Sequence, residues 1–220
     1  MRRFHQKEFV EAGCDEAGRG CLAGPVFAAA VIIPKNFYHP LLNDSKQVAE
    51  EHRSVLRTYI EKKAIAYAVA MVDHEEIDRI NILRASFKAM HLAVDQLRER
   101  PGFLLIDGNR FTPYEGVPHA CIIQGDGRYA AIAAASILAK TYRDEFMMKL
   151  HDEFPQYKWD SNKGYATRAH RNAIMEHGMC SYHRRSFTCI NPQLYLEFGL
   201  DADLLDPPMN DEEAHLLHEG

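Results

Sequence analysis

The sequence contains no long hydrophobic run and no recognisable targeting segment. The longest apolar stretch covers residues 22–33, about 12 residues that include Gly24 and Pro25, whereas a membrane-spanning helix needs roughly 20 apolar residues. The amino terminus begins with charged residues but reaches neither an apolar segment nor a small-residue cleavage site, so we expect no secretory signal. These absences argue against a membrane-spanning or secreted protein.

Cysteine is scarce as well, with five residues and no C-x-x-C pair among them. An odd number without paired spacing argues against a disulfide framework and against a zinc site built from cysteines. We expect the cysteines to behave as small buried hydrophobic residues in a reducing compartment, and we therefore predict a cytoplasmic protein. They are Cys14, Cys21, Cys121, Cys180 and Cys189.

The formal net charge of −5 is unevenly distributed along the chain. Residues 201–220 hold seven acidic side chains and no Lys or Arg, so residues 1–200 carry a net charge of +2. Within that body, residues 127–190 hold ten Lys or Arg against six Asp or Glu. A local basic field permits a polyanionic partner, although an excess of this size is more often an ordinary solvated surface.

The chain has 220 residues, of which 46% are hydrophobic and 26% are charged, and it shows no internal repeat. This composition is typical of a soluble globular domain that folds without disulfides. The polar, turn-rich stretch 155–164 suggests a boundary. We expect a main domain over 1–154, a helical portion over 155–200 that packs on it, and an acidic, disordered tail over 201–220.

Hydrophobic patterning predicts a mixed α/β fold. Short apolar runs predict strands, and a 3.6-residue periodicity predicts amphipathic helices. The strands come first as a meander and then alternate with helices, which is typical of a mixed sheet with helices on its faces. We expect strands over 9–14, 26–33, 64–72, 103–106 and 120–123, helices over 48–63, 129–151 and 167–176, and a further helix that begins at Asn81 and is stopped by Pro101.

Acidic residues follow three of the predicted strands. Asp15-Glu16 follows the first strand, Asp107 follows a buried one, and Asp126 follows the last. Strand ends on one side of an α/β sheet converge, and clustered carboxylates repel one another unless a divalent cation relieves the repulsion. Carboxylate oxygens are ligands that magnesium and manganese prefer. Singly, Asp107 would also suit a common turn and Asp126 a helix N-cap, so the metal-site prediction depends on their combination.

Two short loops have a functional and a structural interpretation. The Gly18-Arg19-Gly20 turn either only makes a tight bend or lets backbone groups approach a sugar or phosphate, with Arg19 binding the anion. Asp44-Ser45-Lys46 is compatible with a capped loop that presents one lysine. Neither loop is informative alone.

The chain resembles the ribonuclease HII family, the prokaryotic type 2 ribonucleases H, over roughly residues 9–190. The resemblance begins with the acidic pair and the glycine turn and continues in order along the chain. Its motifs are Asp15-Glu16-Ala17-Gly18-Arg19-Gly20, Ala23-Gly24-Pro25-Val26, Asp44-Ser45-Lys46, Glu76-Ile77-Asp78, Asn81-Ile82-Leu83, Leu105-Ile106-Asp107-Gly108, Gly125-Asp126, Ala134-Ala135-Ser136-Ile137-Leu138-Ala139-Lys140, Arg143-Asp144, Gly164-Tyr165-Ala166-Thr167, His170, His183-Arg184 and Ser186-Phe187.

The resemblance implies an RNase H-like mixed sheet flanked by helices, with a small helical C-terminal portion. It also implies cleavage of the RNA strand in RNA–DNA hybrids and incision 5′ of single ribonucleotides embedded in duplex DNA. The implied catalytic and metal-binding residues are Asp15, Glu16, Asp107 and Asp126. The implied substrate-binding residues are Gly18, Arg19, Gly20 and Tyr165 at the ribonucleotide, with Lys46, Ser136 and Lys140 at phosphates.

The implied chemistry uses two divalent ions, Mn²⁺ or Mg²⁺, which clamp the scissile phosphate and leave a 3′-hydroxyl and a 5′-phosphate. Specificity depends on the 2′-hydroxyl, the group that distinguishes RNA from DNA. Without the surrounding motif, Tyr165 would be interpreted as a loop aromatic packed on the body. Two alternatives stay open: a non-catalytic nucleic-acid or divalent-ion binding protein on the same fold, and another carboxylate–metal enzyme such as a phosphatase.

Three further points concern the ends of the chain and its assembly. Only eight residues precede the first predicted strand, so the type 2 family fits better than the related type 3 enzymes, which carry an extra N-terminal domain. Residues 193–198 read Gln-Leu-Tyr-Leu-Glu-Phe and look like the short peptides that bind bacterial sliding clamps, although packing of this segment on the body is the simpler interpretation. The family resemblance also suggests a monomer.

Overall fold

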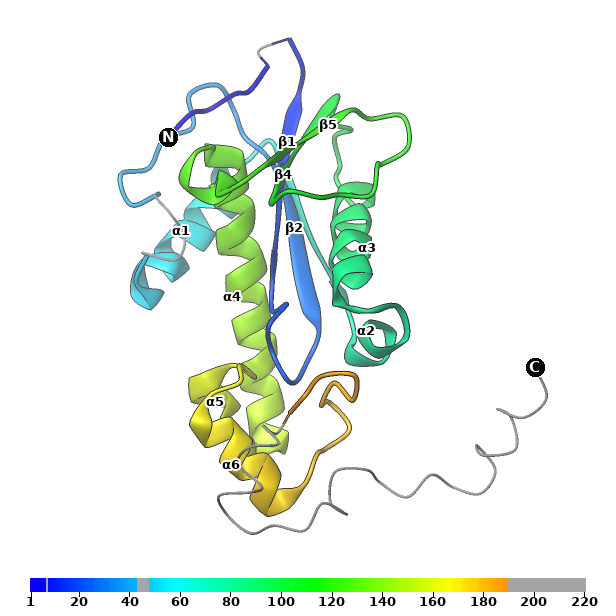
Figure 1. Ribbon diagram of the computed structural model, residues 1–220. Helices are drawn as coiled ribbons and strands as arrows, with labels where there is room; N and C mark the ends of the chain where they lie inside the picture. Colours follow the sequence, from blue (N-terminus) through cyan, green and yellow to red (C-terminus); the bar gives the residue numbers. More distant parts are fainter. Residues whose placement is uncertain (7, 43–47, 190–220) are drawn as a thin grey trace, which may run out of the picture.

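The computed structural model describes residues 1–6, 8–42 and 48–189, and in Figure 1 these residues form a sheet flanked by helices. The sheet has the order β3-β2-β1-β4-β5; β1, β2 and β3 pair antiparallel, whereas β4 and β5 run parallel to β1. The predicted mixed sheet is therefore confirmed. The strands are β1 (Glu11–Ala17), β2 (Val26–Ile32), β3 (Ala66–Val72), β4 (Phe103–Asp107) and β5 (His119–Ile122).

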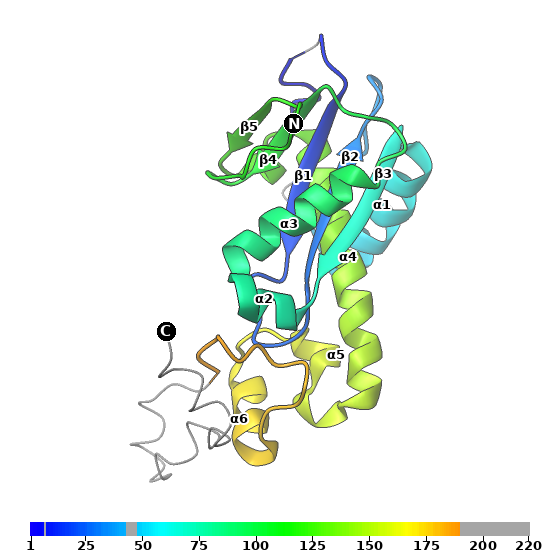
Figure 2. The ribbon, with the colours of Figure 1, turned by 90° about the vertical axis from the view of Figure 1, so that its right-hand side faces the viewer.

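Helices cover both faces of this sheet, as Figure 2 shows. Helices α1 and α4 pack on one face, and α3 packs on the other with α2 beside it. The helices are α1 (Glu50–Lys63), α2 (His74–Ile80), α3 (Ile82–Asp95), α4 (Ala130–Glu153), α5 (Trp159–Asn162) and α6 (Arg168–His177), with short 3-10 turns η1 (Gly125–Gly127) and η2 (Pro155–Tyr157).

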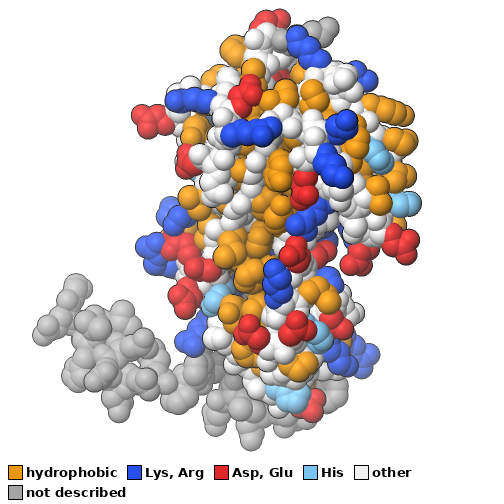
Figure 3. Space-filling model, turned by 180° about the vertical axis from the view of Figure 1, so that it is seen from behind, with side chains coloured by type: hydrophobic (Ala, Val, Ile, Leu, Met, Phe, Trp, Pro, Cys, Tyr) orange, Lys and Arg blue, Asp and Glu red, His pale blue; other side chains and the backbone are white. Residues whose placement is uncertain are grey.

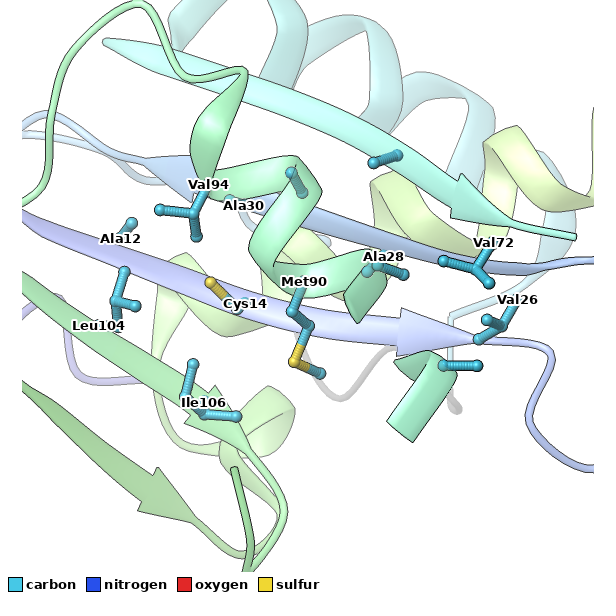
Figure 4. Close-up of a cluster of buried hydrophobic side chains, with 14 of the residues drawn as sticks. Ala12, Cys14, Val26, Ala28, Ala30, Val72, Met90, Val94, Leu104 and Ile106 are labelled. Atoms are coloured by element: carbon cyan, nitrogen blue, oxygen red, sulfur yellow. The ribbon is translucent and has the colours of Figure 1, made fainter. Parts of the chain in front are cut away.

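Strand β2 is buried along its whole length because it has a hydrophobic layer on each side. Alternate side chains of a strand point to opposite faces of its sheet. Val26, Ala28 and Ala30 therefore pack in the α3 layer, shown in Figure 4 with Met90 of α3. The residues between them, such as Ala29, pack against α1 and α4.

Helix α4 lies unusually close to β1. A Cβ atom added to Gly13 would lie 2.2 Å from the carbonyl carbon of Ala131, so only glycine fits at this position. The alanine-rich start of α4, residues 130–135, is buried for the same reason. This close packing brings the middle of α4 next to the carboxyl end of β1, where the acidic pair stands.

The C-terminal portion packs on the second half of α4. Its hydrophobic cluster joins Met147 and Leu150 of α4 to Trp159 and Ile174, and it includes Leu22 from the β1–β2 loop. Residues 155–164, where the sequence suggests a boundary, contain η2 and α5 and bury Tyr157 and Trp159. The division of the chain at this stretch stays a prediction.

Other expectations at the level of elements are confirmed with small differences. Asn81 starts α3 as predicted, since its side chain accepts the Arg84 N–H at 3.1 Å, but α3 ends at Asp95, well before Pro101. Helix α2 was not predicted. All five cysteines are free, and those at positions 14, 21 and 189 are buried, while the other two are partly exposed. Within the described residues, no helix is long and apolar enough to cross a membrane.

Charged side chains are mixed on the face opposite to that of Figure 1. Figure 3 shows Lys and Arg side chains interspersed with Asp and Glu, and a strip of hydrophobic surface between them. On this face the Lys and Arg side chains do not form a separate patch of one sign.

Candidate active site

The acidic residues of β1 and β4 meet at one edge of the sheet. The two strands are parallel neighbours, and Cys14 pairs with Ile106, so the next residues along are Asp15 and Asp107. Paired residues of neighbouring strands point to the same face of a sheet. Both carboxylates therefore point to the same face, and the hydrogen bond from Ser136 of α4 to Asp15 identifies it as the face that α4 covers.

Asp15 is buried, with 6% of its surface exposed. Its Oδ1 accepts the Glu16 N–H at 2.7 Å, and Ser136 of α4 donates a side-chain hydrogen bond to it. Burial raises the pKa of Asp15 well above its ordinary value, and the negative charges of Glu16 and Asp107 raise it further. A bound cation would stabilise the charged form of the buried Asp15 beside the carboxylates of Glu16 and Asp107.

Glu16 lies at the mouth of the same site. Burial raises the pKa of Glu16, while the nearby Arg19 guanidinium opposes that shift. Arg19 Nη1 lies 3.0 Å from Glu16 Oε1, and the arginine side chain is half-exposed. The glycine turn is thus tied by its central residue to the acidic pair.

Asp107 and Asp126 are both held by backbone groups of the η1 turn. Asp107 Oδ1 accepts the Gly125 N–H at 2.7 Å, which joins the end of β4 to this turn. Asp126 is 2% exposed, and its Oδ1 accepts the Gly127 N–H at 3.0 Å. Asp126 stands one turn before α4, whose N-cap is Tyr129, so the alternative interpretation of Asp126 as the N-cap is wrong.

A pocket of about 340 Å³ opens over Asp15, Glu16 and Asp107. Most of the predicted site residues line this pocket, and they come from β1, the glycine turn, β4, α4 and the loop before α6. Asp126 is absent from its lining, and Lys46 lies outside the described residues. The pocket is lined by Asp15, Glu16, Ala17, Gly18, Arg19, Gly20, Arg53, Asp107, Ser136, Lys140 and Tyr165.

Arg53 is the lining residue that sequence reasoning missed. It stands in the first turn of α1, and its position matches no motif that we recognised. It also lines a second groove between α1 and α4, together with Arg57 and Lys163. Only the packing of α1 beside α4 brings Arg53 to the acids, and local sequence patterns carry no signal of that packing.

Tyr165 stands at the far side of the pocket and is 38% exposed. It forms a β-bridge with Cys21, just after the glycine turn. Lys140 Nζ lies 5.3 Å and Arg143 Cζ 5.6 Å from the centre of its ring. Burial and the neighbouring Cys21 thiol raise the pKa of the Tyr165 hydroxyl. Lys140 is also paired with Asp144 at 2.6 Å.

The donor set of this pocket fits a divalent cation in its chemistry. Carboxylate oxygens are hard ligands, and a cation would relieve the repulsion that raises the pKa of Asp15. In the part of the chain that the structure describes, however, no three acidic, histidine or cysteine side chains form a compact ligand group. Asp15, Glu16 and Asp107 therefore line one pocket without forming a compact ligand group.

Comparisons of the sequence and of the fold with known proteins agree on one family. The family model described as Ribonuclease HII matches residues 12–190. The chain is 63% identical over 196 residues to the Ribonuclease HII of Bacteroides thetaiotaomicron, which covers 89% of this chain and 98% of that protein. It also resembles the crystal structure of ribonuclease H2 from Pyrococcus horikoshii, with a TM-score of 0.68 and 24% identity over 87% of this chain and 99% of that one. The structure of the PCNA:RNase HII complex from Archaeoglobus fulgidus matches with a TM-score of 0.66 and 25% identity over 81% and 95% of the two chains.

Proposed function

The chain belongs to the ribonuclease HII family and is a type 2 ribonuclease H, and we propose that it incises 5′ of single ribonucleotides embedded in duplex DNA. The observation that carries this proposal is the pocket itself. It places the acids Asp15, Glu16 and Asp107 beside the glycine turn and Tyr165. Groups that could hold metal ions and groups that could recognise a ribose thus line one pocket.

We propose that Asp15, Glu16, Asp107 and Asp126 hold two divalent ions, Mn²⁺ or Mg²⁺. When bound, such ions activate water and stabilise the leaving 3′-oxygen of the scissile phosphate, so that the products carry a 3′-hydroxyl and a 5′-phosphate. Asp126 is held by the η1 turn next to Gly125, which bonds Asp107. This shared turn supports a role for Asp126 in the same site, although Asp126 does not line the pocket.

The other lining residues have the chemistry to bind the substrate. The backbone of residues 18–20 would contact the ribose 2′-hydroxyl, since this group distinguishes RNA from DNA. The Tyr165 ring would stack on the adjacent deoxyribose at the junction. Lys140 and Ser136 would contact phosphate, and Lys46 would do so from the segment outside the described residues.

The test is cleavage of a DNA duplex that contains one ribonucleotide, with Mn²⁺ or Mg²⁺ and with a chelator control. We expect one cut 5′ of the ribonucleotide, lost with chelator. Asp107→Asn should fold normally, because its amide oxygen still accepts the Gly125 N–H, but should lower kcat by at least about 100-fold, as loss of a metal ligand implies.

The matched control is Asp95→Asn at the end of α3. Asp95 accepts the Tyr114 hydroxyl at 2.6 Å and does not line the pocket, so this variant removes a carboxylate while leaving the site intact. Wild-type activity in Asp107→Asn would contradict the metal-ligand assignment. A wild-type protein that binds but cuts neither this duplex nor a long hybrid would favour the non-catalytic alternative.

A second proposal concerns residues 193–198, which lie outside the described residues. Their sequence, Gln-Leu-Tyr-Leu-Glu-Phe, resembles the short peptides that bind bacterial sliding clamps, and the Archaeoglobus fulgidus relative has been solved in complex with PCNA. We expect a peptide of residues 191–200 to bind the bacterial clamp, and a peptide with Leu196 and Phe198 replaced by alanine not to bind. If neither peptide binds, the proposal is wrong.

A further inference from the structure

Two buried arginines stand behind the substrate pocket and donate their hydrogen bonds to backbone carbonyls. Arg143 and Arg184 are both 0% exposed. Within the described part of the chain, the hydrogen bonds of both guanidinium groups go to backbone carbonyl oxygens and not to carboxylates. A buried charge without such partners would be strongly destabilising, so these carbonyls are needed where they are.

The acceptors of Arg184 belong to the glycine turn. Its Nη2 donates to the Gly18 carbonyl at 2.7 Å and its Nη1 to the Arg19 carbonyl at 2.9 Å. Its Nε donates to the Gly24 carbonyl at 2.9 Å. Figure 1 shows why this is possible: the segment of residues 178–189, coloured orange, runs beside the loop that joins β1 and β2. The backbone confirms this contact, since the Arg184 N–H donates to Leu22.

These bonds determine which way the peptide groups of the turn face. All peptide bonds of the described residues are trans, and in a trans peptide the C=O and the following N–H point in opposite directions. Because the Gly18 and Arg19 carbonyls point at Arg184, the N–H groups of Arg19 and Gly20 point away from it. Arg184 is buried beneath the turn, whereas residues 18–20 line the pocket. Both N–H groups therefore face the side on which substrate would lie.

Only glycine permits this arrangement at position 18. Gly18 has a φ of +96°, and an added Cβ would lie 2.1 Å from Nε of Arg143. The turn therefore fits tightly over the two guanidinium groups. Burial lowers the pKa of Arg184 to about 10, so the group stays protonated at neutral pH. A charged donor on each carbonyl polarises the peptide and strengthens its N–H as a donor.

We propose that Arg184 is a positioning residue for ribose recognition: it holds the Gly18 and Arg19 carbonyls so that the Arg19 and Gly20 N–H groups are presented together to the oxygen of the 2′-hydroxyl. This rests on the proposed function, in which the glycine turn recognises that hydroxyl. Arg184 touches no substrate atom and acts through the turn.

Arg184→Lys tests this role, because one ammonium group cannot reproduce the planar fork that spans two carbonyls. The matched control is Arg171→Lys. Arg171 also donates to backbone carbonyls, those of Thr188 and Cys189, but it makes no contact with the turn. Both variants are made in the Asp107→Asn background, so that binding is measured without cleavage. Fluorescence anisotropy gives the Kd for a duplex with one ribonucleotide and for the same duplex in all-DNA form.

The measured quantity is the ratio of the two Kd values. We expect Arg184→Lys to reduce this discrimination by about tenfold, the order of one hydrogen bond, and Arg171→Lys to leave it unchanged. If Arg184 only stabilises the fold, Arg184→Lys should lower the melting temperature and leave the ratio of the two Kd values unchanged. That result would overturn the proposal. If the Asp107→Asn protein itself binds both duplexes equally, the proposed recognition of the hydroxyl has failed instead.

A second measurement covers the case in which Arg184→Lys does not fold. In the ¹⁵N-labelled protein, the Arg19 and Gly20 amide signals should shift on adding the ribonucleotide duplex and shift much less on adding the all-DNA duplex. Identical shifts with both duplexes would contradict the proposal even though no variant is available.

Discussion

At the scale of single residues, Tyr165 is the side chain best placed to read a junction between RNA and DNA. The residue is 38% exposed, and it lines the pocket together with the glycine turn and Lys140. Lys140 and Arg143 approach the ring, and the bridge to Cys21 fixes the backbone, so the aromatic surface is oriented before substrate arrives. An ordered aromatic can stack on a sugar with little loss of conformational entropy.

We expect Tyr165→Ala to reduce kcat/KM on a single-ribonucleotide duplex by at least about tenfold more than on a long RNA–DNA hybrid. Stacking of a base on an aromatic side chain contributes about 1–3 kcal/mol, and we expect packing of the ring on a sugar to reach the lower half of that range. A long hybrid offers no deoxyribose at the position that the ring would contact. Parallel cleavage assays on the two substrates measure the difference. Tyr165→Phe separates the ring from the hydroxyl, and Tyr38→Ala removes an exposed tyrosine that does not line this pocket. Equal losses on both substrates would argue against junction recognition.

The residues of the pocket differ in how far the sequence predicts them. Asp15 and Asp107 could be predicted because each ends an apolar strand, and strand ends converge by a general rule. The hydrogen bond from Arg184 to the Gly18 carbonyl joins residues that are 166 positions apart. No periodicity or turn signal encodes such a pair. The His183-Arg184 motif makes Arg184 part of the family resemblance. Only the folded chain shows that its side chain donates hydrogen bonds to the glycine turn.

At the scale of elements, a relay of hydrogen bonds joins α5, α6 and the segment before Arg184. His170 Nδ1 lies 2.9 Å from the Tyr165 carbonyl, which can only accept, so His170 carries its proton on Nδ1. His170 Nε2 then accepts from Trp159 Nε1 at 3.0 Å, and His183 Nε2 lies 3.2 Å from the same nitrogen. His183 Nδ1 accepts the Cys180 N–H at 3.0 Å. The partners therefore require both imidazoles to be neutral.

This relay predicts loss of stability in acid. Burial, helped by the neighbouring His170 and His74, lowers the pKa of His183 to about 4, against about 6.5 in the unfolded chain. Between these two values the unfolded state binds the additional proton, so the free energy of unfolding falls as pH falls through this window. The slope from His183 is at most about 1.4 kcal/mol per pH unit.

Urea unfolding at several pH values between about 6.5 and 4.5 measures this slope. We expect His183→Gln to be less stable than wild type at pH 7.5 but to have a shallower dependence on pH. The exposed His52, on α1, provides the control, and His52→Gln should keep the wild-type slope. An unchanged slope in His183→Gln would show that the protonation of this imidazole does not limit acid stability.

The elements that sequence patterns missed are the short ones. Helix α2 has seven residues and buries only Ile77, so two turns carry no apolar periodicity. Asn81, with a φ of +68°, ends α2 and caps α3. In the sequence it was interpreted only as the start of a helix, so the helix that ends there was not predicted. Helix α5 has four residues and is held by the aromatic cluster around Trp159. The longer elements α3 and α4 follow strong local patterns and were predicted.

At the scale of the whole molecule, the C-terminal portion and the sheet share one helix and two buried arginines. Helix α4 packs on β1 with its first half and carries Met147, a core residue of the C-terminal portion, in its second half. Arg143 donates from α4 to the Ala23 and Lys163 carbonyls, so it joins the β1–β2 loop to the segment before Tyr165. A pocket assembled from both parts requires that they fold together, and we propose that residues 1–154 and the portion after them unfold as one unit.

The only tryptophan of the chain makes this proposal measurable. Trp159 is fully buried in the C-terminal portion, so its fluorescence reports on that part, whereas far-UV circular dichroism is dominated by the longer helices over the sheet. Two-state unfolding requires the two probes to give the same urea midpoint.

Met147→Ala should lower the free energy of unfolding by about 2–4 kcal/mol, because Met147 is 0% exposed, and it should shift the urea midpoints of both probes together. Its neighbour Met148 is 42% exposed, and Met148→Ala should cost about 0.5 kcal/mol or less. If Met147→Ala moved the fluorescence midpoint alone, the C-terminal portion would be an independent unit, and the pocket would depend on the docking of two separately stable parts.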